Sequence, residues 1–501
     1  MTDTVMPHWL RKRAELTPDR VAVETFEAAV TFRELNESTR NLAANLQAYG
    51  IKEGDRVALL MGNSLAMIQS YHALAYLGAI AVPLNTRLTP AEIAWQLEDS
   101  GASLLLHDGS KLDSVHGLEP RRAEVRAVRD WISTPARHPA RLKETIRLDE
   151  PHTIIYTSGT TGRPKGVILS HGNHWWSAVG SALNLGVNFD DKWLAAVPLF
   201  HVSGLSILMK SVIYGMPVFL QERFDAKAVN EAIFSRRVTI VSVVTAMMTK
   251  LLDDLGDQAY PAWFRCMLLG GGPAPMPLLE KAKAKGIPVF QTYGLSETAS
   301  QIVTLAPEYM MEKIGSAGKP LFPAEIKIVD DSGKERRPGE EGEIVVKGPN
   351  VTKGYWQRPE ATAEAWRDGW FHTGDIGVLD DDGFLYVLDR RKDLIISGGE
   401  NVYPAEVEAA LVGHPLIEEA GVVGAADNVW GQVPAAFIVT KNGAKLAAAD
   451  VEAFCRNRLA GYKVPKHVFF VDRLPRNASG KLLRRKLVER LPSELRTGVD
   501  G

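Results

Sequence analysis

The chain has 501 residues, 45% hydrophobic and 24% charged, which is long enough for two or more domains of an ordinary globular protein. Its 58 basic and 60 acidic residues give a formal charge of -2, which excludes a bulk electrostatic attraction to nucleic acid or anionic membrane. The two cysteines, Cys266 and Cys455, lack metal-ligand spacing and suit a reducing compartment. The first residues lack a signal-peptide core, and no run of about 18 apolar residues occurs, so we expect a cytoplasmic protein without a membrane span.

The first part of the chain alternates helical patterns with short apolar runs. Thr31 and Glu34 form a capping-box pair, which predicts a helix over residues 31–50 that ends at a glycine. Amphipathic stretches such as residues 277–286 separate apolar runs that are typical of buried strands, at residues 56–61, 238–244, 266–271 and 287–294. This alternation predicts an α/β fold with parallel strands and crossover helices, in which ligands bind at the carboxyl ends of the strands.

Residues 156–167, "YTSGTTGRPKGV", combine glycines and hydroxyl side chains with a lysine. The backbone N–H groups of such a turn can surround an anion, and Lys165 can neutralise phosphate charge. In the P-loop of kinases and GTPases a serine or threonine follows the lysine, but here Gly166 follows it. The stretch therefore predicts a phosphate site of another class, and a plain glycine-rich surface loop is the alternative.

After about residue 320 the pattern changes to alternating strands. Residues 324–348 predict a hairpin around an Asp-Ser-Gly turn, and residues 376–391 predict a second hairpin around Asp-Gly. Together they indicate an antiparallel, barrel-like part. We therefore expect a large N-terminal domain over residues 1–390, built from α/β layers and this barrel-like part.

A smaller α+β domain is expected over residues 391–501. Helices are predicted at residues 404–414 and 448–462, around a strand at residues 435–441. On composition alone, the Lys/Arg-rich residues 476–490 are equally compatible with a solvated tail.

Five motifs, in order, resemble those of the acyl- and aryl-CoA synthetases, a family of adenylate-forming enzymes. They are "YTSGTTGRPKGV" (156–167), "YGLSET" (293–298), "GWFHTGD" (369–375), "DRRKDLIISGGENVYPAEVE" (389–408) and "PRNASGK" (475–481). The resemblance covers roughly residues 8–490 and implies ATP, Mg²⁺ and CoA as ligands. In this family a carboxylate attacks the α-phosphate of ATP and expels pyrophosphate. The CoA thiol then attacks the acyl-adenylate and releases AMP.

Attack of one anion on another needs cations and oriented donors at the reacting phosphate. By resemblance, Glu297 binds the metal, Ser296 contacts the α-phosphate and Thr298 assists. Many relatives have threonine at the position of Ser296, and serine keeps the hydroxyl. Lys481, from the small domain, bridges the acid and the α-phosphate. The β- and γ-phosphates are assigned to Thr157, Ser158, Gly159, Thr160, Thr161, Gly162 and Lys165.

The nucleoside and the domain movement are assigned by the same resemblance. Tyr293 offers a flat face to adenine, beside Gly271, Gly272 and Pro273. Asp375 accepts the ribose hydroxyls, and Arg390 approaches the same ribose. Lys392 is the expected hinge, where many relatives have aspartate. After rotation of the small domain, residues 397–400, with Gly398 and Gly399, are expected to face the pantetheine arm of CoA, because glycines let it pass close to the backbone.

Segments between the motifs, such as "PLFHVSGLS" and "LLGGGPAP", resemble members that activate 2-succinylbenzoate for menaquinone biosynthesis. His201 matches an aromatic position that gates the acid or the pantetheine tunnel. The rest of the expected acyl pocket is Ser203, Gly204, Thr245, Gly271 and Ser300. This substrate has a second carboxylate, which needs a donor when buried. Lys210 can supply it, or its stem can carry the ammonium out to water, which is the interpretation we favour.

Three alternatives remain open at this point. A medium-chain, long-chain or aryl acid–CoA ligase would share every motif. A stand-alone adenylation enzyme would load a carrier protein instead of CoA. A nonenzymatic nucleotide sensor would lack Lys481 or the complete phosphate loop, and both are present. The sequence leaves the oligomeric state open, a homo-oligomer included.

Overall fold

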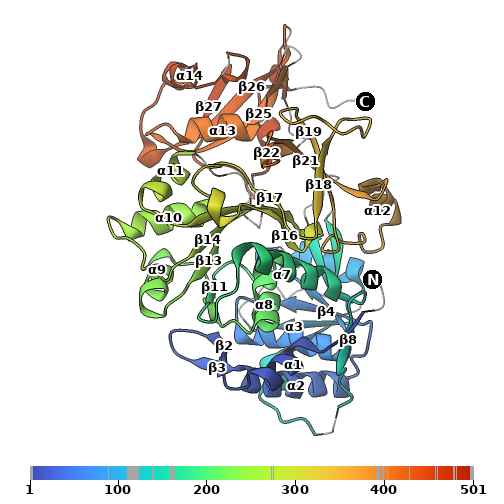
Figure 1. Cartoon of the computed structure of the whole chain (residues 1–501). Coiled ribbons are helices and arrows are strands. Elements are labelled where there is room, and N and C mark those ends of the chain that lie inside the picture. The colour runs from blue at the N-terminus through green and yellow to red at the C-terminus, as the bar shows by residue number, and fades with distance from the viewer. Residues whose placement is uncertain are drawn as a thin grey trace.

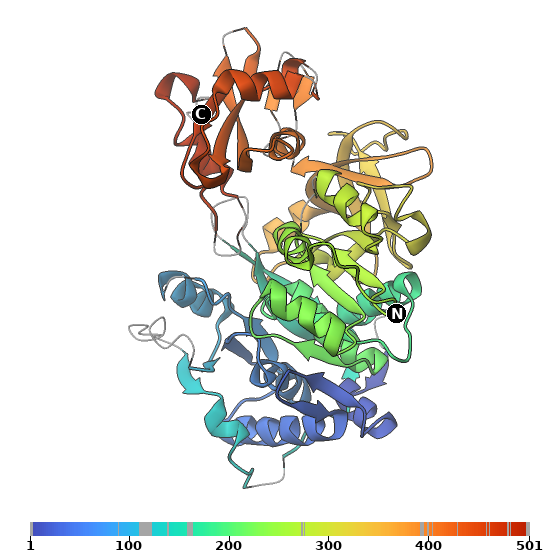
Figure 2. The ribbon, with the colours of Figure 1, turned by 90° about the vertical axis from the view of Figure 1, so that its left-hand side faces the viewer.

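The computed structural model describes residues 4–88, 90–109, 123–137, 140–157, 164–271, 274, 276–390, 395–397, 400–402, 404–427, 429–456, 458–459, 461–477, 480 and 482–496. Two large mixed sheets form the body of the molecule, and a curled antiparallel half-barrel and a C-terminal unit lie above them in Figure 1 and Figure 2. Among the helices described, none has the length and apolar character needed to cross a membrane.

The first large sheet has six strands in the order β10-β9-β5-β4-β6-β7. All neighbouring strands are parallel except β9 and β10, which are antiparallel. The strands are β4 (Arg56–Leu60), β5 (Ile80–Pro83), β6 (Leu104–His107), β7 (Glu124–Ala127), β9 (Pro151–Thr157) and β10 (Lys165–Ser170). The predicted phosphate loop therefore joins two strands of a hairpin, whereas a P-loop joins a strand to a helix.

The second large sheet has nine strands in the order β17-β16-β15-β14-β13-β11-β12-β2-β3. Its central strands are parallel, as the sequence predicts, and β3, β16 and β17 add antiparallel edges. The strands are β2 (Val21–Glu24), β3 (Ala29–Thr31), β11 (Trp193–Ala195), β12 (Val218–Leu220), β13 (Ile240–Val243), β14 (Cys266–Leu269), β15 (Val289–Leu295), β16 (Ser300–Thr304) and β17 (Lys319–Pro320). A short separate pair joins β1 (Val5–Pro7) and β8 (Thr145–Arg147).

Helices pack on the faces of both sheets (Figure 1). They are α1 (Trp9–Leu16), α2 (Phe32–Tyr49), α3 (Leu65–Leu77), α4 (Pro90–Ser100), α6 (Arg129–Ile132), α7 (His171–Leu185), α8 (Val202–Tyr214), α9 (Ala226–Ser235), α10 (Thr245–Leu255) and α11 (Met276–Ala284). One hydrophobic core contains side chains of α3, α8 and both sheets. Because α3 and α8 are apolar on nearly every side, they are buried in this core.

The predicted helix over residues 31–50 is confirmed as α2. The Thr31 hydroxyl accepts from the Glu34 backbone N–H at 3.2 Å, and the Glu34 carboxylate accepts from the Thr31 backbone N–H at 2.8 Å. Gly50 ends the helix with φ +113°, a conformation that favours glycine.

The half-barrel contains both predicted hairpins. β18 (Glu325–Val329) pairs with β19 (Gly342–Lys347), and β21 (Trp370–Leu379) pairs with β22 (Leu385–Arg390), in each case antiparallel. The sheet is completed by β20 (Trp366–Arg367), beside α12 (Pro359–Ala365). Tyr293 of β15 packs into the core of this half-barrel, so the half-barrel is anchored at the end of a central strand of the nine-stranded sheet.

The C-terminal residues form two further hydrophobic cores of their own. Their elements are β23 (Ile395–Ser397), β24 (Glu400–Val402), α13 (Pro404–Val412), β25 (Ile417–Asp427), β26 (Gly431–Thr440), α14 (Ala448–Arg456), β27 (His467–Phe470) and α15 (Arg484–Val488). The predicted domain boundary falls between β22 and β23, and it stays a prediction.

The basic C-terminal stretch is not a solvated tail where it is described. Leu487 and Leu491 are buried in a core, and Arg484 forms a 2.7 Å ion pair with Glu408 of α13. The charged residues of this stretch therefore alternate with apolar residues that fix it to the C-terminal unit.

Five of the twelve histidines form a buried cluster in the N-terminal body. They are His8, His72, His152, His171 and His174, all at most 4% exposed. The ring of His152 lies 4.8 Å from that of His171 and 5.0 Å from that of His174, measured between centroids. Burial lowers the pKa of His72 to about 4 and is the main cause that lowers the pKa of His171 and His174 to about 3. These rings are therefore neutral in the folded protein at neutral pH.

We expect this cluster to make the N-terminal body acid-sensitive. Unfolding lets each ring bind a proton below its ordinary pKa of 6.5, so the free energy of unfolding should decrease as the pH falls from about 6.5 towards 4. For His72 alone the loss at pH 5 is about 2 kcal/mol. Urea unfolding at pH 7.5 and pH 5 measures the decrease in the free energy of unfolding. His72→Leu should show a decrease that is smaller by the contribution of His72. An equal pH dependence in both proteins would contradict this assignment.

Candidate active site

Five of the described candidate residues lie directly after parallel strands or in the loops that follow them. His201 follows β11, Thr245 follows β13, and Gly271 follows β14. Ser296 and Glu297 follow β15 directly. Because β11, β13, β14 and β15 are neighbours in one sheet, their carboxyl ends form one edge. These candidates therefore lie at the edge where the parallel arrangement predicts ligand binding, and their roles as ligand contacts stay predictions.

Gly271 lies close to Val244, the residue that precedes Thr245. A Cβ added to Gly271 would lie 3.1 Å from Cγ1 of Val244, and Gly271 has φ +85°, so both space and conformation favour glycine here. This leaves backbone rather than side chain exposed to a ligand at the end of β14.

Tyr293 and Asp375 come from different sheets and meet directly. The Tyr293 hydroxyl donates to Oδ2 of Asp375 at 2.9 Å, and the two residues are 8% and 5% exposed. Asp375 lies in β21, which pairs with β22 so that Asp375 is opposite Arg390. The carboxylate is thereby fixed next to an aromatic ring, an arrangement that suits a ribose beside a purine.

Ser296, Glu297 and Thr298 form a 3₁₀ turn after β15. The Thr298 hydroxyl accepts from the Leu295 backbone N–H at 2.8 Å and donates to the Ser300 carbonyl at 2.7 Å. Thr298 is completely buried, so its hydroxyl serves the turn itself. The side chains of Ser296 and Glu297 are partly exposed and remain on the accessible side.

Lys165, at the start of β10, approaches the same turn through a residue that the sequence analysis missed. Its ammonium lies 5.2 Å from the centroid of the Tyr355 ring, and the Tyr355 hydroxyl donates to Oε1 of Glu297 at 3.0 Å. Burial, and then the Glu297 charge, raise the pKa of Tyr355 well above its ordinary value. No local pattern marks Tyr355, because its contacts join segments that are distant in the sequence.

The N-terminal end of α8 forms a second group of candidates. His201 immediately precedes the helix, and burial followed by the charge of Arg87 lowers its pKa to about 4, so the ring is neutral at neutral pH. A Cβ at Gly204 would lie 2.3 Å from the Pro198 carbonyl oxygen, so the chain there requires glycine. The hydroxyl of Ser206 donates to the carbonyl of Ser203, one helical turn before it, at 2.9 Å. Its hydroxyl also lies 3.4 Å from the Ser300 hydroxyl.

Lys210 does not carry its ammonium to water, so the interpretation that we favoured from the sequence is wrong. The residue is 1% exposed, and its Nζ donates to Oε1 of Gln301 at 2.7 Å. The ammonium also lies 5.2 Å from the centroid of the Trp193 ring. Both of these recorded neighbours of the ammonium, Gln301 and Trp193, are neutral side chains. Burial accordingly lowers the pKa of Lys210 to about 7.

A buried lysine among neutral groups is costly unless an anion joins it. Lys210 lies four residues after Ser206 on the helix, so both side chains project from one face of α8. Their partners, Ser300 and Gln301, are adjacent in β16. This face of α8 and the start of β16 therefore place the buried amino group of Lys210, which can carry a positive charge, next to the residues expected to hold the acid.

Several candidates lie outside the residues that the structure describes. They are Ser158, Gly159, Thr160, Thr161, Gly162, Gly272, Pro273, Lys392, Gly398, Gly399 and Lys481. Thr157 is described, and its hydroxyl contacts the Lys165 carbonyl at 3.5 Å across the hairpin. All these roles stay predictions.

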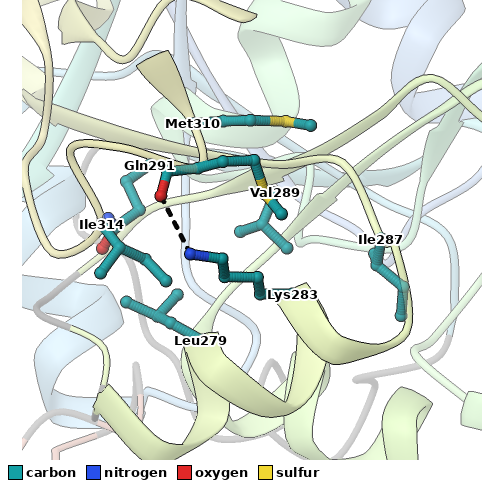
Figure 3. Close-up of a pocket in the computed structure, with 8 residues that line it drawn as sticks. Leu279, Lys283, Ile287, Val289, Gln291, Met310 and Ile314 are labelled. Carbon is teal, nitrogen blue, oxygen red and sulfur yellow. Dashed lines mark hydrogen bonds between the residues drawn. The ribbon is translucent and has the colours of Figure 1, made fainter. Parts of the chain in front are cut away.

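A shallow pocket on the body, drawn in Figure 3, contains none of the candidate residues. It lies beside α11 and the first half of β15, where Leu279, Ile287 and Val289 give it an apolar wall. Its lysine, Lys283, donates to the Met311 carbonyl at 3.2 Å. No carboxylate side chain is among the described residues that line this pocket, so we assign it no role in the reaction.

Comparison with known proteins defines the class. Residues 10–356 match the AMP-binding enzyme family, and residues 406–481 match the AMP-binding enzyme C-terminal domain. The chain belongs to this family of adenylate-forming enzymes.

Individual relatives are similar over nearly the whole chain. The 2-succinylbenzoate–CoA ligase of Geobacillus kaustophilus (strain HTA426) is 61% identical over 494 residues, which cover 99% of this chain and 100% of that protein. The o-succinylbenzoate CoA synthetase of Bacillus subtilis, solved with the acyl-adenylate intermediate OSB-AMP, is 50% identical with a TM-score of 0.92. That match covers 97% of this chain and 98% of the other.

A double mutant of the same Bacillus subtilis protein, solved with the product analogue OSB-NCoA, has a lower TM-score of 0.76. Its identity to this chain is again 50%, and it covers 97% of this chain and 99% of that one. Because identity and coverage are nearly unchanged, the lower score reflects a difference in shape. This chain is closer in shape to the acyl-adenylate complex.

Proposed function

We propose that the chain is an ATP-dependent acid–CoA ligase that converts 2-succinylbenzoate to 2-succinylbenzoyl-CoA in menaquinone biosynthesis. The observation that carries this function is the 61% identity to a 2-succinylbenzoate–CoA ligase over 99% of this chain and 100% of that protein. One carboxylate of the acid attacks the α-phosphorus of ATP, and pyrophosphate leaves. The CoA thiolate then attacks the acyl carbon of the adenylate, and AMP leaves. The setting for this pathway would be the cytoplasm.

The described residues support a nucleotide in this site. Tyr293 would stack on adenine, and Asp375, whose carboxylate Tyr293 holds in place, would accept from the ribose hydroxyls. Lys165 would contact the β- and γ-phosphates, and Ser296 the α-phosphate. Glu297 has a partly exposed carboxylate, and carboxylate oxygens are ligands that suit a Mg²⁺ bound to ATP. When bound, the metal neutralises charge on the phosphates.

Lys210 is the residue that we propose for the second carboxylate of the substrate. Its ammonium is buried, its described partners are neutral, and it projects towards the start of β16 beside Ser300. A carboxylate at this position would form a charge-assisted hydrogen bond that compensates the burial of the ammonium. His201, Ser203, Gly204, Thr245 and Gly271 would form the rest of the acyl pocket.

Two orientations of the C-terminal domain would serve the two half-reactions, with Lys392 as the hinge. The shape difference between the acyl-adenylate and product-analogue complexes of the Bacillus subtilis protein supports this proposal. After rotation, Gly398 and Gly399 would face the pantetheine arm. Arg390, at the end of β22, would reach the ribose from the domain border.

Lys392→Pro tests the hinge. Proline fixes φ near −65° and cannot follow a large backbone rotation, so this variant should form acyl-adenylate at close to the normal rate but transfer the acyl group to CoA poorly. Pyrophosphate release and CoA-ester formation, measured separately, give the two rates. Normal overall turnover by a folded variant would rule out rotation at this residue.

The function itself is tested by product analysis. The purified chain, given ATP, Mg²⁺, CoA and 2-succinylbenzoate, should release one pyrophosphate and one AMP for each CoA thioester detected by mass spectrometry. Pyrophosphate release without a thioester would favour an adenylation enzyme that loads a carrier protein. Efficient use of octanoate or palmitate instead would favour a fatty acid–CoA ligase.

A further inference from the structure

Tyr355 lies between the cation and the carboxylate that are proposed to hold the metal-bound triphosphate. Its ring faces the Lys165 ammonium at 5.2 Å, and its hydroxyl donates to Oε1 of Glu297 at 3.0 Å. A lysine is attracted to the face of an aromatic ring, and a carboxylate accepts from a phenol, so one side chain satisfies both charges at once.

Backbone hydrogen bonds attach the segment around Tyr355 both to the turn that carries Glu297 and to the strand that carries Lys165. The Thr352 backbone N–H donates to the Glu297 carbonyl at 2.6 Å, so the segment fixes the backbone as well as the side chain of Glu297. On the other side, Trp356 N–H donates to the Gly166 carbonyl at 2.7 Å, and Tyr355 forms a bridge with Val167 of β10. The strand that carries Lys165 and the turn that carries Glu297 are thus joined through residues 352–356.

We infer that Tyr355 is a positioning residue for the metal-bound triphosphate. It orients the Glu297 carboxylate for the metal and keeps the Lys165 ammonium on its ring, where that ammonium faces the phosphates instead of pairing with Glu297. This inference rests on the proposed function, because it takes ATP and its metal as the ligands of Lys165 and Glu297. Its test therefore separates the Tyr355 role from the existence of the site.

Tyr355→Phe removes only the hydroxyl and keeps the ring. Residues that hold a metal ligand in place typically contribute roughly 10- to 100-fold to metal affinity. Binding of Mn²⁺ to the full chain with a non-hydrolysable ATP analogue, measured by electron paramagnetic resonance, should therefore weaken about tenfold or more. Binding of the analogue in EDTA should stay within about twofold, because Lys165 keeps its ring. Tyr355→Leu, which removes the ring as well, should also weaken the metal-free binding.

Two controls make the result specific. Tyr260→Phe removes another partly buried phenol, which donates to Oδ1 of Asn230 at 2.7 Å and is not among the candidate site residues, and it should leave Mn²⁺ binding unchanged. Glu297→Asp shortens the side chain by one methylene and so moves the carboxylate away from the Tyr355 hydroxyl. On that background Tyr355→Phe should have little further effect, because the interaction that it removes is already lost.

The possible outcomes are distinguishable. Wild-type Mn²⁺ affinity in Tyr355→Phe, with normal metal-dependent binding in the unchanged chain, would overturn the role of Tyr355 alone. Absence of metal-dependent nucleotide binding in the unchanged chain would overturn the proposed nucleotide site. If Tyr355→Phe lowers Mn²⁺ affinity by the same factor with and without the Glu297→Asp substitution, the effect does not pass through the carboxylate and the inference fails.

Discussion

Lys481→Ala is expected to abolish formation of the acyl-adenylate while sparing the second half-reaction. The lysine is proposed to bridge the attacking carboxylate and the α-phosphate, where negative charge accumulates during adenylation. Losing one such positioned donor costs on the order of 10³-fold in rate. Transfer of the acyl group from supplied acyl-adenylate to CoA should stay close to normal, because the proposed rotation of the C-terminal domain would by then have moved Lys481 away from the reacting atoms.

The two half-reactions are measured separately, one by pyrophosphate release from ATP and the other by thioester formation from synthetic acyl-adenylate. Lys486→Ala, in the same basic stretch, provides a matched loss of charge and should affect neither rate strongly. An equal decrease of both half-reactions in Lys481→Ala would show that this lysine acts in both steps, or that the variant disturbs the domain as a whole.

Lys210→Met is expected to lower the proposed preference for the diacid over a monoacid by roughly 10²-fold. The variant keeps most of the buried stem and removes the ammonium. Removing one partner of a buried charge pair costs about 2–5 kcal/mol, so kcat/KM for 2-succinylbenzoate should fall by roughly 10²-fold, mainly through KM. The value for benzoate should change little. His201→Ala should also raise KM for the diacid more than for a monoacid.

The matched control is Lys192→Met, which removes another largely buried ammonium, one that pairs with Glu24 at 2.5 Å near the beginning of β11. It should not alter the preference between acids.

The wild-type KM for the diacid should also rise as the pH increases above about 7, because Lys210, with its pKa lowered to about 7, loses its charge there. Lys210→Met should lack this rise. A rise of the same size in the variant would assign it to another group.

The elements that local chemistry specifies were predictable. The capping box at Thr31 and Glu34 identifies α2, and the Asp-Ser-Gly turn identifies the hairpin of β18 and β19. Apolar runs identify β13, β14 and β15, because strands buried on both faces are apolar throughout. The gathering of candidate residues at the carboxyl ends follows from this parallel arrangement.

What could not be predicted depends on contacts between distant segments. The order of strands in the nine-stranded sheet, with β2 beside β12, is not encoded in any local pattern. The burial of Lys210 was missed because a lysine in an apolar helix has the same sequence pattern whether its end reaches water or Gln301. Tyr355 was missed because Glu297 and Lys165, which it contacts, are 58 and 190 residues away in the chain.

Competition between acids tests the central claim most directly. Values of kcat/KM for 2-succinylbenzoate, benzoate and octanoate are measured with the unchanged chain under saturating ATP, Mg²⁺ and CoA. A site that has committed buried polar groups to a distal carboxylate rejects an acid that lacks it by factors on the order of 10⁴, far more than a missing methylene costs in an apolar pocket. We therefore predict that 2-succinylbenzoate exceeds both monoacids by about that factor. Comparable values for all three acids would contradict the account and leave a general acid–CoA ligase.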